Sequence, residues 1–185
     1  VFASNVFFFL KAGYFDTASE FKPLLHTWSL AVEEQYYFFF PLFLLVMWRF
    51  GMRRITAVCI ATVLVSLAIA QWSAIQYSAF AFYLLPARLW EILLGAVVAM
   101  LLLSDGEGDA VKKWIGNSAV AEVASFLGVA LIVYAMFTFD RGTPFPGLYA
   151  LVPTIGTALI ILFANATTLT GRLLGSKWLV GIGVI

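Results

Sequence analysis

Charged residues are scarce in this chain of 185 residues. Only 11% are Asp, Glu, Lys or Arg, whereas soluble domains carry about 25%. Hydrophobic residues make up 63% of the chain and aromatic residues 17%. A soluble domain of this size could not cover so much apolar surface, because its outer face must meet water. The scarcity of charge therefore excludes an ordinary soluble domain and favours a protein surrounded by lipid.

Cysteine and net charge are also low, and each excludes a class of protein. Cys59 is the single cysteine, so the chain cannot form an internal disulfide, and we interpret it as a small buried hydrophobe. The formal net charge of +1 gives no basic surface for nucleic acid. The acidic stretch 105–109 begins like a calcium loop but lacks the glycine and glutamate that an EF-hand needs later in the loop. We therefore expect no metal site.

The hydrophobic residues fall into runs long enough to cross a bilayer. A transmembrane helix needs about 20 apolar residues, and a helix satisfies its own backbone hydrogen bonds in lipid. Five runs come close to that length, namely 30–50, 55–72, 80–103, 119–139 and 148–164. Apolar stretches at 1–10 and 178–185 indicate partial spans. The sequence thus predicts an all-α, polytopic transmembrane helix bundle, with residues 1–185 forming the central part of one membrane domain in a longer chain.

The distribution of basic residues predicts how the spans are oriented. Loops on cytoplasmic sides are enriched in Lys and Arg. One set of alternate loops holds seven basic residues and the other set holds four. The richer set is Arg49, Arg53, Arg54, Lys112, Lys113, Arg172 and Lys177. We therefore expect the loops near 52, 104–116 and 167–177 to be cytoplasmic, and those at 11–26, 71–78 and 140–147 to face outward.

Prolines and glycines indicate turns and kinks. Residues 143–147 predict a rigid outer turn, in which Pro144 and Pro146 fix φ and Gly147 allows a positive φ. Pro86 and Pro153 lie inside or at the edges of spans. We expect them to kink helices whose freed carbonyls find other partners.

The start of the first full span is unusually polar. If its helix begins near Thr27, then His26, Ser29, Glu33 and either Tyr36 or Tyr37 share one stripe. An acidic residue at the centre of a transmembrane helix costs about 2.5–3.5 kcal/mol. Two interpretations stay open at this point. The stripe is either part of a functional site or a polar helix start at headgroup depth, with its aromatic residues in the interfacial belt.

A second polar cluster occurs in the third run. Arg88 and Glu91 are three positions apart, in the part of the run expected to lie on the same side as Glu33. The pair either forms a salt bridge that only holds helices together, or it lines a pocket shared with the first span. In the second case the arginine would bind an anionic or hydroxyl-bearing substrate.

Two segments resemble a known family. Residues 28–37, Trp-Ser-Leu-Ala-Val-Glu-Glu-Gln-Tyr-Tyr, preceded by Pro-Leu-Leu-His-Thr at 23–27, resemble the signature of the acyltransferase 3 family of membrane O-acyltransferases. Ser4 and Asn5, with Gly-Tyr-Phe-Asp at 13–16, resemble the segment that leads into that signature. Residues 88–96, beginning Arg-Leu-Trp-Glu, resemble a later segment of the family.

The resemblance implies a function and a location. It implies transfer of an acyl group, often acetyl, from a coenzyme A thioester to a hydroxyl of an extracytoplasmic saccharide or glycolipid. Lipopolysaccharide and peptidoglycan are typical acceptors, and the expected location is the bacterial cytoplasmic (inner) membrane. The expected partners are acyl-CoA (acetyl-CoA) as donor substrate, the acceptor and the lipid bilayer, with no bound cofactor. The family's catalytic histidine and its arginine motif are expected before Val1, so this piece alone is expected to be inactive.

Three residues are the candidates for catalysis. Acyl transfer to a hydroxyl needs a base and donors that stabilise the oxyanion. We expect Glu33 to position the acceptor hydroxyl or the absent histidine, Arg88 to donate to the oxyanion or substrate, and Glu91 to orient Arg88. The weaker, substrate-binding candidates are His26, Trp28, Ser29, Gln35, Tyr36 and Trp90.

A secondary transporter or lipid-linked sugar carrier is the alternative function. Transporters also place charges inside a helix bundle, but they usually show internal repeats with paired broken helices. No repeat is visible between the two halves of this sequence. A purely structural membrane subunit is disfavoured by the depth of Arg88 and Glu91.

Overall fold

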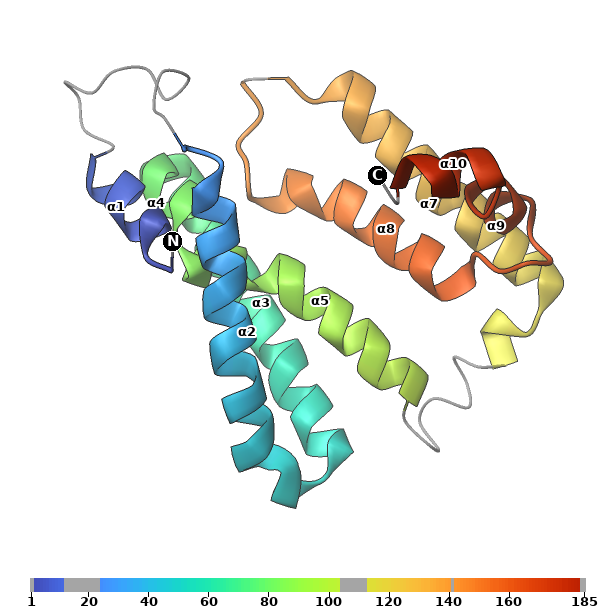
Figure 1. Ribbon diagram of the computed structural model, residues 1–185, viewed down its shortest axis with the longest axis horizontal. Helices are drawn as coiled ribbons and strands as arrows, with labels where there is room; N and C mark the ends of the chain where they lie inside the picture. The colour runs from blue at the N-terminus through green and yellow to red at the C-terminus, as the bar shows by residue number, and fades with distance from the viewer. Residues whose placement is uncertain (1, 12–23, 104–112, 141, 184–185) are drawn as a thin grey trace. The chain divides into compact units, whose positions relative to one another are not determined.

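The computed structural model describes residues 2–11, 24–103, 113–140 and 142–183. These residues form helices joined by turns, and no strand occurs among them (Figure 1). The predictions that fall on 13–16 and 105–109 lie outside the described residues. The helices are α1 (Ser4–Lys11), α2 (Thr27–Met47), α3 (Met52–Gln76), α4 (Ser78–Tyr83), α5 (Leu85–Leu103), α7 (Ser118–Thr138), α8 (Leu151–Phe163), α9 (Leu169–Leu174) and α10 (Lys177–Gly183), with 3-10 turns η2 (Trp48–Phe50) and η3 (Leu148–Ala150).

The predicted multi-pass helical architecture is confirmed. Among the described residues, four helical stretches are long and apolar enough to cross a membrane, namely Thr27–Phe50, Met52–Gln76, Ser78–Leu103 and Ser118–Thr138. The fifth predicted run is helical but shorter, because α8 has only 13 residues. Such a helix rises about 20 Å, against a hydrocarbon core of about 30 Å. The 3-10 turn η3 occupies the start of the run, and with α8 it forms the shorter apolar helix Leu148–Phe163.

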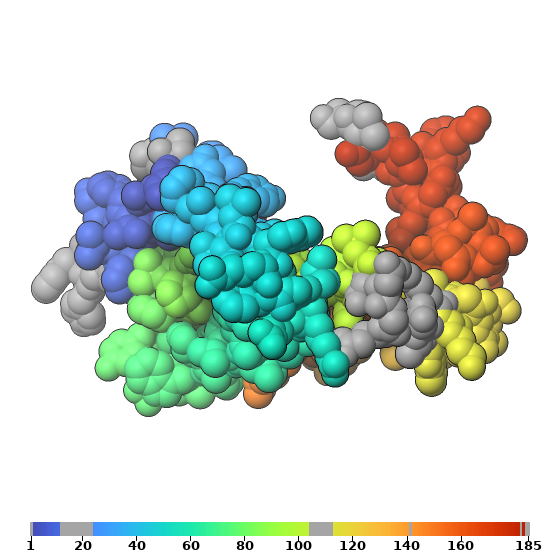
Figure 2. All heavy atoms as spheres, turned by 90° about the horizontal axis from the view of Figure 1, so that it is seen from below, coloured from blue at the N-terminus to red at the C-terminus, as the bar shows by residue number. Residues whose placement is uncertain are grey.

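The chain divides into two compact units. The first contains residues 1–94 and 144–149, and the second contains residues 95–143 and 150–185. In the first unit α1 packs on α2 and α4, and α4 packs on α3. The space-filling view shows the residues of α1, α2 and α3 gathered together (Figure 2). Both polar clusters predicted from the sequence belong to this first unit.

Buried amide groups hold α1 in place. Asn5 is 1% exposed, and its side chain accepts from Gln35 Nε2 at 2.9 Å and donates to the carbonyl oxygen of Tyr83 at 3.2 Å. Beside it, Ser4 Oγ donates to the carbonyl oxygen of Thr27 at 2.8 Å. These bonds join α1 to the start of α2 and to the end of α4, so Ser4 and Asn5 have a structural role.

The third predicted span is broken near its start. Leu84 has an extended backbone, with φ −99° and ψ 139°, and it separates α4 from α5. Pro86 has no N–H to donate, and the carbonyls around the break bond to side chains instead. The carbonyl oxygen of Phe82 accepts from Arg88 Nε at 3.3 Å, while that of Tyr83 accepts from Asn5. The expected kink at Pro86 is thus a complete break, and the expected rescue of carbonyls beside it is confirmed.

The predicted turn at 143–147 is present and packs on α3. Gln71 Oε1 accepts the N–H of Leu148 at 2.8 Å. A Cβ at Gly147 would collide with that same Gln71 oxygen. Among the described glycines, Gly51 is the one with a positive φ, so the predicted positive φ at Gly147 is wrong. A side chain at position 147 would therefore displace the Gln71 side chain from its bond to Leu148.

The second unit is built on one close helix pair. A Cβ at Gly128 of α7 would lie 2.6 Å from the carbonyl oxygen of Gly156 of α8, and one at Gly156 would lie 2.7 Å from that of Gly128. Small residues at a crossing let helix backbones approach in a membrane. Further along, the Glu122 carboxylate accepts the N–H of Leu169 at 3.0 and 3.2 Å. This acidic residue of α7 therefore caps the start of α9.

Candidate functional site

The two predicted polar clusters meet in one pocket of the first unit, which we call the Glu33 pocket. It has a volume of about 120 Å³. The helix α2 contributes one wall and α5 the other. The lining residues are Trp28, Ser29, Val32, Glu33, Arg88, Glu91 and Ile92. The three residues predicted to be catalytic thus line a common cavity.

The start of α2 determines which side chains reach the pocket. Thr27 is the first residue of α2, as the sequence predicts, and His26 precedes it without a side-chain capping bond. Ser29 and Glu33 are four residues apart and lie on the same helix face. Ser29 Oγ donates to the carbonyl oxygen of His26 at 3.1 Å. Within the described residues, the exposed Glu33 carboxylate has no hydrogen-bond or ion-pair partner, and it is therefore available to a ligand.

Glu91 and a backbone carbonyl fix the guanidinium of Arg88. Arg88 Nη1 donates to both carboxylate oxygens of Glu91, at 3.1 and 3.0 Å, and Nε donates to the carbonyl oxygen of Phe82. The Arg88 side chain is only 10% exposed. Its Nη2 group has no partner in the part of the chain that the structure describes. One donor edge of a rigidly held cation is therefore left unused.

Three aromatic rings surround the same guanidinium. Its central carbon lies 5.2 Å from the ring centre of Trp28, 5.3 Å from that of Phe82 and 5.2 Å from that of Phe145. Each such contact stabilises a cation by about 0.5–2 kcal/mol, more where water is excluded. These rings stabilise Arg88 in an apolar setting, where Glu91 is its one acidic partner among the residues that the structure describes.

This arrangement suits recognition of a hydroxyl and an oxyanion. A carboxylate without a partner accepts hydrogen bonds, whereas a guanidinium edge donates them in a fixed plane. Glu33 and Arg88 supply these two functions from opposite walls of the pocket. The pocket can therefore hold a group that both donates and accepts, such as a sugar hydroxyl next to a carbonyl.

Sequence reasoning missed several residues that shape the pocket. Phe82 and Phe145 contact Arg88 from the short helix α4 and from the 143–147 turn. Ser66 of α3 bonds to the backbone of α5 on either side of Arg88. Aromatic residues are common throughout this chain, so neither phenylalanine stood out. A serine within an apolar run was the only available signal for Ser66.

Four predicted substrate-binding residues do not line the pocket: His26, Gln35, Tyr36 and Trp90. Gln35 is bonded to Asn5, and Tyr36 is buried beside Phe40. Trp90 is fully buried, with 0% exposure, and its part in substrate binding stays a prediction. Trp28 and Ser29 do line the pocket, and the Trp28 ring contacts the Arg88 guanidinium.

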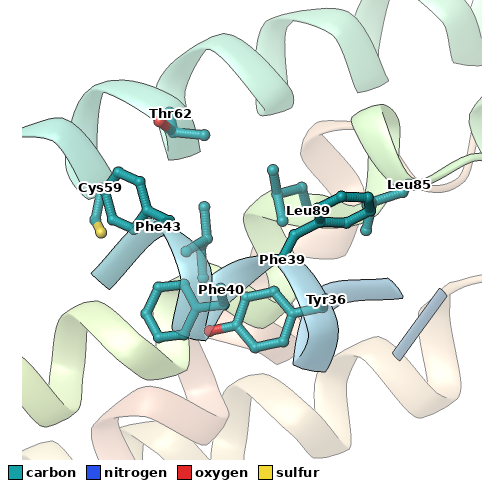
Figure 3. Close-up of a pocket in the computed structure, with 9 residues that line it drawn as sticks. Tyr36, Phe39, Phe40, Phe43, Cys59, Thr62, Leu85 and Leu89 are labelled. Carbon is teal, nitrogen blue, oxygen red and sulfur yellow. The ribbon is translucent and has the colours of Figure 1, made fainter. Parts of the chain in front are cut away.

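A separate apolar cavity lies deeper along α2. Its volume is about 250 Å³, and its walls come from α2, α3 and α5 (Figure 3). Tyr36 and Phe40 are stacked there, with ring centres 4.8 Å apart. Cys59 is buried and also lines this cavity, as expected for a small hydrophobe. The cavity has almost no polar lining, so it lacks the groups that a saccharide would require.

Comparison with known proteins gives several similar sequences. An uncharacterized protein of Haemophilus influenzae is 30% identical over 86% of this chain and 66% of its own length. OatA, the peptidoglycan O-acetyltransferase of Listeria monocytogenes, is 26% identical over 96% of this chain and 29% of its own length. BcsY of Komagataeibacter xylinus, provisionally named a membrane-bound transacylase, is 31% identical over 93% of this chain and 41% of its own length.

The chain thus spans less than two thirds of the length of these relatives. No family model and no solved structure matches it. The names of the characterised and provisionally named relatives support a membrane acyltransferase of some kind. This multi-pass membrane protein is therefore similar to an acyltransferase-like family of membrane proteins.

Proposed function

We propose that this chain forms part of a membrane O-acyltransferase that moves an acyl group, such as acetyl, from a coenzyme A thioester to a saccharide hydroxyl outside the cytoplasm. The observation that carries the proposal is the meeting of Glu33, Arg88 and Glu91 in one pocket. The names of the relatives supply the reaction class, and one of them, OatA, is named for acting on peptidoglycan. The bacterial inner membrane is the proposed location.

Arg88 stabilises the charge that develops during transfer. As the hydroxyl attacks the acyl carbonyl, negative charge grows on the carbonyl oxygen, and a preorganised donor at that point lowers the barrier. The unused Nη2 group of Arg88 is that donor. Glu91 and the aromatic rings already hold the guanidinium, so little reorganisation accompanies the reaction.

Glu33 accepts a hydrogen bond from the attacking hydroxyl and orients it. Alternatively, it holds the histidine base that the family resemblance implies in another span. In either case the hydroxyl oxygen forms the new ester bond, the acyl carbon separates from the thioester sulfur, and the base takes the hydroxyl proton. General-base assistance of this kind contributes about 10²–10⁴-fold to a rate.

The test compares two adjacent glutamates in the full-length protein. Glu33→Gln removes the carboxylate from the pocket, whereas Glu34→Gln makes the same change at a residue outside the lining. Acyl ester formation is measured in membrane vesicles supplied with acetyl-CoA and peptidoglycan fragments. We expect Glu33→Gln to lower the rate at least about 10²-fold and Glu34→Gln to leave it near that of the unaltered protein. Equal expression with undiminished esterification in Glu33→Gln would contradict the proposal.

The break in the third predicted span favours the alternative function, a carrier of lipid-linked sugar. The same vesicle experiment can test it. Discontinuous transmembrane helices form the substrate sites of many secondary transporters, and Leu84 interrupts this span. A carrier would move a lipid-linked sugar across the vesicle membrane without forming any ester. Sugar movement that depends on Glu33, in the absence of esterification, would favour that function.

A further inference from the structure

We propose that Ser66 is a positioning residue for the Glu33 pocket, a role that rests on the proposed function. Ser66 lies on α3 and is 3% exposed. Its hydroxyl donates to the carbonyl oxygen of Pro86 at 2.7 Å and accepts the backbone N–H of Trp90 at 3.0 Å. One side chain of α3 thus bonds to two backbone groups of α5.

These two groups are four residues apart in α5. In an α-helix, the carbonyl of residue i accepts the N–H of residue i+4, so Pro86 and Trp90 would ordinarily pair with each other. The Ser66 hydroxyl of α3 bonds to both of these groups. It thereby ties the start of α5, from Pro86 to Trp90, to a fixed point on α3. Ser66 therefore helps to determine where the start of α5 lies relative to α3.

Other buried serines of the described spans behave differently. Ser73, also on α3 and 0% exposed, donates to the carbonyl of Ile69 in its own helix at 2.6 Å. Ser125 of α7 likewise donates to Glu122 of its own helix at 3.1 Å. Such local bonds need no partner helix. The contact from Ser66 to α5 is therefore not the usual way of satisfying a buried hydroxyl.

The bridged turn carries the reactive side chains. Arg88 lies between Pro86 and Trp90, and Glu91 follows at once. Without the hydroxyl, both bonds from α3 to this turn are lost. The start of α5 can then shift along α3, and Arg88 would move relative to Glu33 on α2. A misplacement of about 1 Å in an active site can cost about 10² in rate.

The test uses Ser66→Ala in the full-length protein, with Ser73→Ala as the matched control. Both changes remove a buried hydroxyl from α3, but only the first removes a contact with α5. We expect Ser66→Ala to lower kcat about tenfold or more, with the KM for the saccharide acceptor little changed. Ser73→Ala should retain kcat, and Ser66→Thr, which restores a hydroxyl, should recover most of the lost rate.

Amide hydrogen exchange gives a second measurement that does not depend on activity. Peptides covering residues 85–93 should change their exchange in Ser66→Ala and not in Ser73→Ala. Unaltered exchange together with unaltered kcat in Ser66→Ala would overturn the proposal, as would equal losses in the two alanine variants. If Ser66→Ala does not accumulate, Ser66→Cys replaces it, and an unchanged kcat there is equally adverse. Failure of the proposed function would instead appear as no acyl transfer by the unaltered protein.

Discussion

Replacement of Arg88 by lysine tests whether its planar donor edge matters, apart from its charge. Lysine keeps a positive charge near Glu91 but lacks the fork of N–H groups. The change removes the bond from Nε to the carbonyl of Phe82, at 3.3 Å, and the unused Nη2 donor. Because the Arg88 side chain is only 10% exposed, water cannot readily replace those donors.

The expected loss can be worked from the contacts. Removal of one donor that stabilises an oxyanion costs about 2.7–4 kcal/mol, or about 10²–10³ in kcat. We expect the loss of kcat in Arg88→Lys to fall in that range. The amount of folded protein should stay the same, since Glu91 retains a cationic partner. Arg88→Leu should also destabilise the protein by about 3–5 kcal/mol, because it leaves Glu91 as an uncompensated charge.

The assay measures initial rates of acetyl transfer from acetyl-CoA to peptidoglycan fragments by the full-length protein in vesicles. Arg49→Lys is the control, because Arg49 also lies over an aromatic ring, that of Phe50 at 5.0 Å, but is exposed and far along the chain from the pocket. A rate for Arg88→Lys equal to that of Arg49→Lys would refute a catalytic role for the guanidinium edge.

Two further predictions concern stability. Gly128→Leu should force α7 and α8 apart and lower the thermal unfolding temperature of the purified protein. Gly95→Leu is the control and should not lower it, because a Cβ at Gly95 meets nothing within 4 Å. Equal unfolding temperatures for the two variants would contradict the close crossing. Asn5→Leu should leave Gln35 without its amide partner and lower the free energy of unfolding by about 1–3 kcal/mol. The expected readout is faster proteolysis of the purified protein. Asn5→Leu that resists protease as well as the unaltered protein would show that the amide pair contributes little.

The spans and the polar clusters could be predicted from local sequence. Hydropathy finds α2, α3 and α7 because each is a long apolar segment bounded by charged residues or turns. Helical spacing places Ser29 and Glu33 on one face, and the charge pattern associates that face with Arg88. These features depend on residues that are near neighbours in the chain, so composition and periodicity report them.

The remaining features depend on contacts between distant segments. The break at Leu84 lies inside a continuous apolar run, and Pro86 alone could not distinguish a kink from an interruption. Ser66 meets Trp90 across 24 positions, and Phe145 meets Arg88 across a still longer separation. Neither pairing has a sequence signal, because both are created by how the helices pack.

The enclosure of Arg88 has a consequence for exchanging parts of this protein with its relatives. Phe145 belongs to the unit formed by residues 1–94 and 144–149, although the segments 95–143 and 150–185 on either side of 144–149 belong to the other unit. A chimera that takes residues 95–185 from a relative would therefore import a foreign wall for the guanidinium. Chimeras joined at 143 and 149, which leave the 144–149 segment native, should preserve the ring over Arg88. The boundaries of a workable graft thus follow spatial neighbours and not the linear order of the spans.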